Sequence, residues 1–191
     1  MANSKTPLLT AQWNELVLEA EEAIQIHLDE DLESYLVFLL MRFHSRPEIA
    51  RSVMALEYLE GLQSSGQIRR EQLRSVGDQC LLYSGLFPQR ARRNRVTVGY
   101  YIDLGRSAYR NLAEDERFAF AEIFTKLAIH FVSLMDTLQA LRSIGMETPL
   151  LDPLTAAELW QESGGRHARA VLGSVTTADL MPQPPTSAPK H

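Results

Sequence analysis

The sequence predicts an all-α protein, a single-domain helical bundle of about six to eight helices. Three observations support this prediction. Apolar residues recur at steps of three and four along most of the chain, which places them on one face of a helix. Short polar segments with capping residues separate these stretches. The 191 residues, 45% of them hydrophobic and 23% charged, suit one globular domain with a sizeable core.

Two helices are predicted in the first 44 residues. The hydroxyl of Thr10 can accept a free backbone amide, so this residue is the expected N-cap of the first helix. The apolar face of that helix is made by Trp13, Leu16, Val17, Ala20, Ile24 and Leu28. The second helix, over residues 32–44, contains the run YLVFLLM. Because this run is apolar on every side, we expect the second helix to be central and buried.

Two further helices are predicted between residues 45 and 88. Ser45 and Glu48 have the spacing of a capping box, which marks a helix start. The expected buried stripe of this third helix is Ile49, Val53, Leu56, Leu59 and Leu62. After a turn at residues 64–67, a fourth helix runs to Pro88, which ends it. Its apolar face holds Leu73, Val76, Cys80, Leu81 and Tyr83.

The second half of the chain continues this pattern. A fifth helix has one face made of Tyr101, Gly105, Ala108 and Leu112. The sixth is the clearest, because apolar residues step by four and three without a break from Phe120 to Leu141, and His130 beside them is expected to hydrogen-bond between helices. A capping box at Thr155 opens a short last helix. We therefore expect a helical bundle domain over 1–172 and a proline-containing, disordered C-terminal tail over 173–191.

Composition restricts the function classes. The net charge of -5 argues against a surface built wholly for nucleic acid, which draws on concentrated Lys and Arg. The single cysteine, Cys80, cannot form an internal disulfide and favours a reducing compartment. The chain starts without a secretory signal, and its most apolar run is too short to cross a bilayer. A cytoplasmic protein of the bacterial type, without a membrane span, is expected.

No pattern names a reaction. None of the five histidines pairs with another His or Cys at ligand spacing, so no metal site is expected. A phosphate-cradling glycine loop and the nucleophile elbow G-x-S-x-G are both missing, so neither a cofactor nor a catalytic residue is expected. The acidic clusters at 29–33 and 114–116 precede helices, where the helix dipole favours negative charge.

One stretch, residues 76–113, is unusual. Asp78 lies beside Gly77 in an otherwise apolar helix, and Arg90 opens an arginine-rich connection on an acidic protein. A helix that mixes tyrosines, arginines and an aspartate follows. The candidate ligand-binding residues are Asp78, Arg92, Arg93, Arg95, Tyr100, Tyr101, Asp103, Arg106 and Tyr109.

Two interpretations of this stretch remain open. Arginine forks bind carboxylate or phosphate groups and tyrosines offer stacking faces and hydroxyls, so the stretch can hold an anionic small molecule, an RNA segment or an acidic partner. The structural alternative is that Asp78 and Asp103 pair with arginines of the loop and pin it against the bundle. In that case Gly105 lets two helices approach closely.

The segments GDQCLLYSGLFP and YYIDLGRSAYRNLA resemble a pattern of uncharacterised bacterial all-helical proteins, in which G-D…L…G-x-F-P is followed by Y-Y…G…A-Y. The resemblance covers residues 77–113 and carries no known activity. It singles out Asp78, Gly85, Phe87, Pro88, Tyr100, Tyr101, Gly105 and Tyr109.

The sequence thus favours a non-enzymatic interaction or regulatory protein, with a homodimer or another protein as partner and a contact site within residues 90–110. The first alternative is a protein or enzyme that binds a small anionic ligand. It would use Arg92, Arg93 and Arg95 as clamps and Tyr100 or Tyr101 as a hydrogen-bond donor. Binding of RNA or DNA through the basic loop is a third, less favoured hypothesis.

Overall fold

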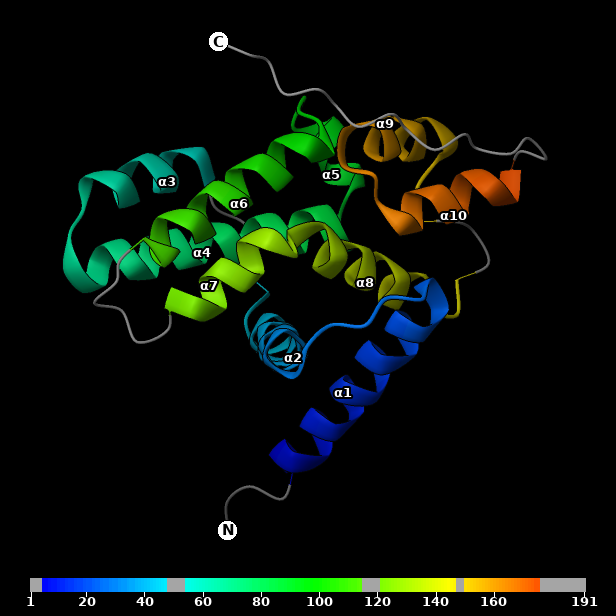
Figure 1. Cartoon of the computed structure of the whole chain (residues 1–191), viewed down its shortest axis with the longest axis horizontal. Helices are drawn as coiled ribbons and strands as arrows, with labels where there is room; N and C mark the ends of the chain where they lie inside the picture. Colours follow the sequence, from blue (N-terminus) through cyan, green and yellow to red (C-terminus); the bar gives the residue numbers. More distant parts are fainter. Residues whose placement is uncertain (1–4, 48–53, 115–120, 147–149, 176–191) are drawn as a thin grey trace.

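The computed structural model describes residues 5–47, 54–114, 121–146 and 150–175. These residues form ten helices and no strand, which confirms the all-α class with more helices than expected. The helices are α1 (Lys5–Ile24), α2 (Glu30–Ser45), α3 (Met54–Gln63), α4 (Gly66–Leu86), α5 (Gln89–Arg93), α6 (Val98–Ala113), α7 (Ala121–Ile129), α8 (Phe131–Ser143), α9 (Pro153–Ser163) and α10 (Arg166–Val175) (Figure 1).

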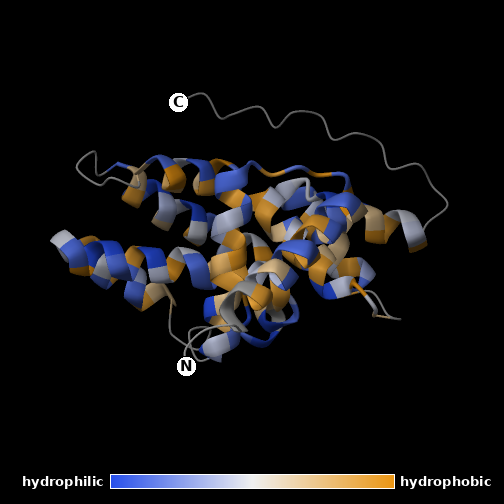
Figure 2. Cartoon of the chain, turned by 90° about the horizontal axis from the view of Figure 1, so that it is seen from below, coloured by the Kyte–Doolittle hydropathy of each residue, from blue (hydrophilic) through white to orange (hydrophobic). Residues whose placement is uncertain are grey.

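Helix α4 is the centre of the bundle. It packs against α3, α6 and α8, and every residue of α4 from Val76 to Leu86 is buried. The contact with α6 is close because Gly105 has no side chain. A Cβ atom at this position would lie 2.8 Å from the Cβ of Cys80 and 2.7 Å from the Cζ of Phe131. The interpretation of Gly105 as a close-approach residue is therefore confirmed. Hydrophobic residues gather where the helices meet (Figure 2).

Helix α2 is less enclosed than its apolar sequence suggests. Leu36, Val37, Leu39 and Leu40 are buried, but Phe38 is 61% exposed. The expectation that the run is buried on every side is wrong for that side. Helix α1 packs against α8 and α2, and its N-terminal end reaches beyond the other helices (Figure 1). It begins at Lys5, so Thr10 lies inside the helix rather than at its N-cap, and its hydroxyl donates to the Sδ of Met41 at 3.5 Å.

Helix α3 turns a different face inward from the one predicted. Leu56 and Leu59 are each 55% exposed, whereas Met54 and Gly61 are buried. Gly61 lies against Leu73 of α4, because a Cβ there would come within 3.1 Å of the Leu73 Cδ2. The face with the small residue is therefore the packed one, and the predicted stripe is wrong for all three leucines, since Leu62 is also 37% exposed. Ile49, Val53 and Glu48 of the predictions lie outside the described residues.

The long sixth helix of the prediction is two helices, α7 and α8. They meet at His130, whose φ of -93° and ψ of 16° break the helical geometry. His130 is exposed, so its expected position between helices is wrong. Arg106 on α6 hydrogen-bonds to the backbone next to this break, since its Nε donates to the Ala128 carbonyl at 3.2 Å. Phe131, Leu134 and Leu138 beyond the break are fully buried, as their spacing predicts.

Helices α9 and α10 cover one end of the bundle (Figure 1). Asp152 is the N-cap of α9, accepting from the Thr155 amide at 3.1 Å, so the helix begins before the predicted start at Thr155. The start of α10 is held by Asp136 of α8, a buried carboxylate that accepts from the Arg166 amide at 2.7 Å and from the His167 amide at 3.3 Å.

Helix α10 runs to Val175, and the remaining residues of the predicted tail, 176–191, lie outside the described residues. The domain limits stay a prediction. Within the described residues, no helix has both the length and the apolar composition needed to cross a bilayer.

Candidate functional site

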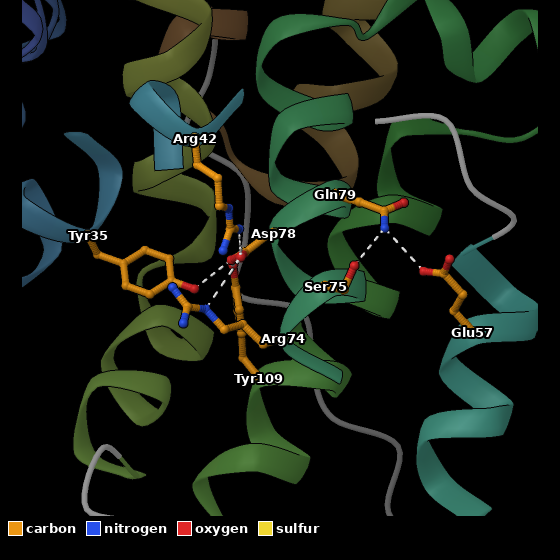
Figure 3. Close-up of polar contacts among 8 residues, drawn as sticks. All are labelled: Tyr35, Arg42, Glu57, Arg74, Ser75, Asp78, Gln79 and Tyr109. Carbon is orange, nitrogen blue, oxygen red and sulfur yellow. Dashed lines mark hydrogen bonds and ion pairs between the residues drawn. The ribbon is translucent and has the colours of Figure 1, made fainter. Parts of the chain in front are cut away.

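Asp78 is the centre of a buried polar cluster (Figure 3). Its Oδ1 accepts hydrogen bonds from the hydroxyls of Tyr35, at 2.5 Å, and Tyr109, at 2.8 Å. Its Oδ2 forms an ion pair with the Nη2 of Arg42 and lies 3.6 Å from the Nε of Arg74. The four partners come from three helices, α2, α4 and α6, so one carboxylate joins the helices at the centre of the fold.

The local sequence explains how the cluster forms. Asp78 follows Gly77, and a Cβ at Gly77 would lie 2.7 Å from the Cδ1 of Tyr109, so the glycine makes room for the tyrosine ring. Arg74 is one helical turn before Asp78, which places the two on the same face of α4. The Arg74 guanidinium also lies over the Tyr35 ring, 5.5 Å from its centroid. The arrangement is therefore fixed from several directions.

The two tyrosine hydroxyls beside Asp78 keep their protons in this environment. Burial, together with the charge of Asp78, raises the pKa of Tyr35 and Tyr109 well above the ordinary value for tyrosine. Both hydroxyls therefore stay protonated and act as donors. Cys80, two residues after Asp78 in α4, is also buried, and burial raises the pKa of its thiol. None of these groups has the lowered pKa of an activated nucleophile.

A cavity of about 260 Å³ lies beside the cluster and is lined by Arg42, Glu71, Arg74, Ser75, Asp78 and Gln79. Gln79 fixes one wall, since its Nε2 donates to the Oε2 of Glu57 at 3.1 Å and to the Oγ of Ser75 at 2.9 Å (Figure 3). The sequence identified Asp78 and Tyr109 but missed Tyr35, Arg42 and Arg74. The i,i+4 spacing of Arg74 and Asp78 is the one local signal that could have pointed to a partner.

A second feature is a group of arginines around α5, which we call the α5 basic surface: Arg90, Arg93, Arg95 and Arg142. The guanidinium carbons of Arg90 and Arg142 lie over the Phe87 ring, 4.8 Å and 5.1 Å from its centroid. Arg142 also donates to the Leu86 carbonyl at the end of α4. Burial and then the charge of Arg90 lower the pKa of Arg142.

The other two arginines of the α5 basic surface are exposed. Arg95 has a positive φ of 57° and follows the end of α5, where the Val96 amide donates to the Ala91 carbonyl at 3.0 Å. Within the part of the chain that the structure describes, Arg93, Arg95 and Arg142 form no ion pair. The side chain of Arg92 lies outside that part. The exposed guanidinium groups of Arg93 and Arg95 can therefore contact an acidic group from outside the chain.

The predicted residues on α6 divide between two places. Tyr101 is buried, and its hydroxyl accepts from the Nδ2 of Asn94 at 2.9 Å, which fastens the end of α5 to α6. Burial raises the pKa of Tyr101. Tyr100, Asp103 and Arg106 line a cavity of about 550 Å³ between α6 and α9, together with Glu162. The Glu162 carboxylate accepts from the Gly99 amide at 3.2 Å.

The structure therefore does not assemble the predicted residues into one site. Asp78 and Tyr109 belong to the buried cluster, Arg93 and Arg95 to the α5 basic surface, and three others to the α6 cavity. The structural alternative predicted ion pairs between Asp78 or Asp103 and loop arginines. Asp78 instead pairs with helix arginines, and Asp103 forms no ion pair among the described residues.

No group of three or more His, Cys, Asp or Glu within the described ranges is arranged to hold a metal ion. The likeness to uncharacterised bacterial helical proteins over 77–113 stays a prediction. No family model, no curated protein and no solved structure matches the chain.

Proposed function

We propose that the protein is a non-enzymatic recognition protein that binds an acidic segment of a partner protein through the α5 basic surface. The observation that carries this proposal is the pair Arg93 and Arg95, two exposed guanidinium groups that form no ion pair among the described residues. A guanidinium group can bind a carboxylate through two parallel hydrogen bonds. Arg90 and Arg142, whose guanidinium carbons lie over the Phe87 ring, complete the α5 basic surface.

Exposure favours a macromolecular partner over an enclosed small molecule. Small ligands bind in concave sites that remove most of their surface from water. Arg93 and Arg95 are exposed, so an extended chain with several carboxylates matches them better than a single small anion does. The predicted donors Tyr100 and Tyr101 do not complete a small-molecule clamp there, because Tyr101 is buried and Tyr100 lines the α6 cavity.

The aromatic residues favour an acidic protein segment over nucleic acid. Single-stranded nucleic acids bind by stacking bases on free aromatic faces beside a basic groove. Here Phe87 is covered by the guanidinium groups of Arg90 and Arg142, and Tyr83 and Tyr101 are buried. Carboxylates need no stacking surface, and bidentate contacts with arginine suit them.

The experiment that tests this function measures the affinity of the full chain for a fluorescently labelled oligoglutamate peptide by fluorescence anisotropy. We expect saturable binding that weakens as salt is added, because the contacts are charge pairs at an exposed surface. The double variant Arg93→Ala/Arg95→Ala is expected to weaken binding by about tenfold or more, which corresponds to about 1.4 kcal/mol. Arg110→Ala is the matched control, since Arg110 is an exposed arginine near the other end of α6.

A single-stranded oligonucleotide with the same number of charges is measured in parallel. Tighter binding of the oligonucleotide, lost in the same double variant, would favour the nucleic-acid hypothesis and overturn the proposal. Equal losses in Arg110→Ala and the double variant would show attraction to the overall charge rather than recognition at α5.

Homodimer formation and a cytoplasmic location stay predictions. Sedimentation velocity over a range of protein concentrations measures the first, and a concentration-independent monomer would contradict it.

A further inference from the structure

We infer that the cavity of about 550 Å³ between α6 and α9, the α6 cavity, is a binding site for an aliphatic primary amine in its charged ammonium form. Its lining combines acidic, hydroxyl, aromatic and aliphatic side chains. Those that carry the argument are Tyr100, Ile102, Asp103, Val132, Glu162 and Ser163. None of them belongs to the α5 basic surface, so this site is independent of the proposed partner surface.

The lining of the α6 cavity carries a net negative charge. It contains two carboxylates, Asp103 and Glu162, and one cation, Arg106. Neither carboxylate forms an ion pair among the described residues. The Nε of Arg106 donates to the Ala128 carbonyl at 3.2 Å, so part of this guanidinium is already bound to the backbone near the end of α7. Two negative charges against one positive charge favour a cation in the cavity over the anion expected from the sequence.

The carboxylate of Glu162 is held in place by the start of α6. Its Oε2 accepts from the Gly99 amide at 3.2 Å. A Cβ at Gly99 would lie 3.0 Å from the Cδ of Glu162, so a side chain at this position would crowd the carboxylate. The other oxygen, Oε1, has no hydrogen-bond partner among the described residues. One oxygen therefore fixes the side chain, and the other can accept a hydrogen bond from a ligand.

Two further side chains supply oxygen acceptors. The carboxylate of Asp103 forms no hydrogen bond within the described part of the chain. The Oγ of Ser163 donates to the Leu159 carbonyl at 2.7 Å, which leaves the lone pairs of this oxygen to accept. A primary ammonium group has three N–H donors and no acceptor. It therefore matches a lining of two carboxylates and a hydroxyl, with charge-assisted hydrogen bonds to the carboxylates.

The rest of the lining suits the carbon chain of an amine better than a metal ion. Ile102 and Val132 are aliphatic, and Tyr100 is 38% exposed, so its ring can attract a cation. Calcium and magnesium ions bind through about six or more oxygen ligands. Among the residues that the structure describes, no three His, Cys, Asp or Glu side chains are arranged for a metal. The volume of about 550 Å³ is in the range of small-molecule sites.

The test is a titration of the full chain with butylammonium chloride, followed in ¹H–¹⁵N NMR spectra against sodium chloride at the same ionic strength. We expect saturable shifts that are largest over residues 97–106 and 159–163. Asp103→Asn and Glu162→Gln should each lower the affinity by about tenfold, because each removes a charged acceptor and keeps the shape of the side chain. Both residues are exposed, so both variants should remain folded. Glu15→Gln, at an exposed glutamate of α1, is the matched control and should bind like the unchanged chain.

Two other cations and one more variant separate the alternatives. Tetramethylammonium has the same charge but no N–H donor, so we expect it to bind at least about tenfold more weakly than butylammonium. Arg95 lies two residues before Thr97 but does not line the cavity. Arg93→Ala/Arg95→Ala should therefore bind butylammonium at least as tightly as the unchanged chain, although it is expected to lose the acidic peptide.

Three results would each overturn the inference. The first is a set of shifts that do not saturate, or an affinity that Asp103→Asn and Glu162→Gln both leave unchanged. The second is equal or tighter binding of tetramethylammonium, which would show attraction to charge without hydrogen bonds. The third is tighter binding of calcium ions that the same two variants abolish, which would identify a metal site.

Discussion

Replacing Asp78 by asparagine should destabilise the fold more than any exposed charge substitution. The change keeps the shape of the side chain but removes the charge that faces Arg42 and Arg74. Loss of one partner of a fully buried ion pair costs about 3–5 kcal/mol. Here the arginine side chains are 38% and 48% exposed, so water recovers part of that loss. The amide also remains a weaker acceptor for the two tyrosine hydroxyls. We therefore expect the free energy of unfolding to fall by about 3 kcal/mol.

Urea unfolding, followed by circular dichroism at 222 nm, the usual helix wavelength, measures this change. Asp103→Asn is the matched control, because Asp103 is an exposed aspartate without an ion pair among the described residues. Its effect should stay within about 0.5 kcal/mol. If Asp78→Asn costs no more than Asp103→Asn, the cluster does not join α2, α4 and α6 in the way we describe.

Two further substitutions test the packing and the buried charge. Burial raises the pKa of Asp136 from the ordinary 3.8 to about 6, so protonation favours the folded state. Its stabilising contribution is complete below about pH 4 and is lost as the pH rises through about 6, a change of about 3 kcal/mol in the free energy of unfolding. Asp136→Asn should remove that dependence in urea titrations at a series of pH values, and an unchanged profile would contradict the assignment. Gly105→Ala should cost about 1–3 kcal/mol, since the new Cβ would lie 2.5 Å from the Cε2 of Phe131. Gly173→Ala, with open space around it, should not destabilise the protein. Equal thermal melting shifts for the two alanine variants would refute the close packing of α4, α6 and α8.

Local sequence patterns were sufficient for the all-α class and for most of the helices, but not for the faces that pack. The three- and four-residue steps from Phe120 predicted helix correctly. The break at His130 was not predictable, because the sequence there has no proline or glycine to mark it. Leu56 and Leu59 were expected inside because they are apolar. The face that contains Gly61 packs against α4 instead, since a residue without a side chain allows a close approach between the two helices. The face of a helix that is buried depends on the helix that packs against it. The sequence pattern of one helix carries no information about that neighbour.

The site was predictable only in part for the same reason. An aspartate in an apolar helix signalled that Asp78 has partners, and Tyr109 was found because it lies in the same unusual stretch. Tyr35 and Arg42 come from a helix about forty positions earlier, and their approach to Asp78 is set by the crossing of α2 and α4. The capping role of Asp136 was missed altogether. It depends on the start of α10, thirty residues away in the chain.

The most direct measurement of the proposed function is a map of the amides that shift in ¹H–¹⁵N NMR spectra when the oligoglutamate peptide is added. We expect the largest shifts over residues 89–95 and around Arg142, where the positive charges gather on Phe87. Shifts that fall instead on α3 or α10, with α5 unchanged, would contradict the claim that the arginines around α5 are the recognition surface.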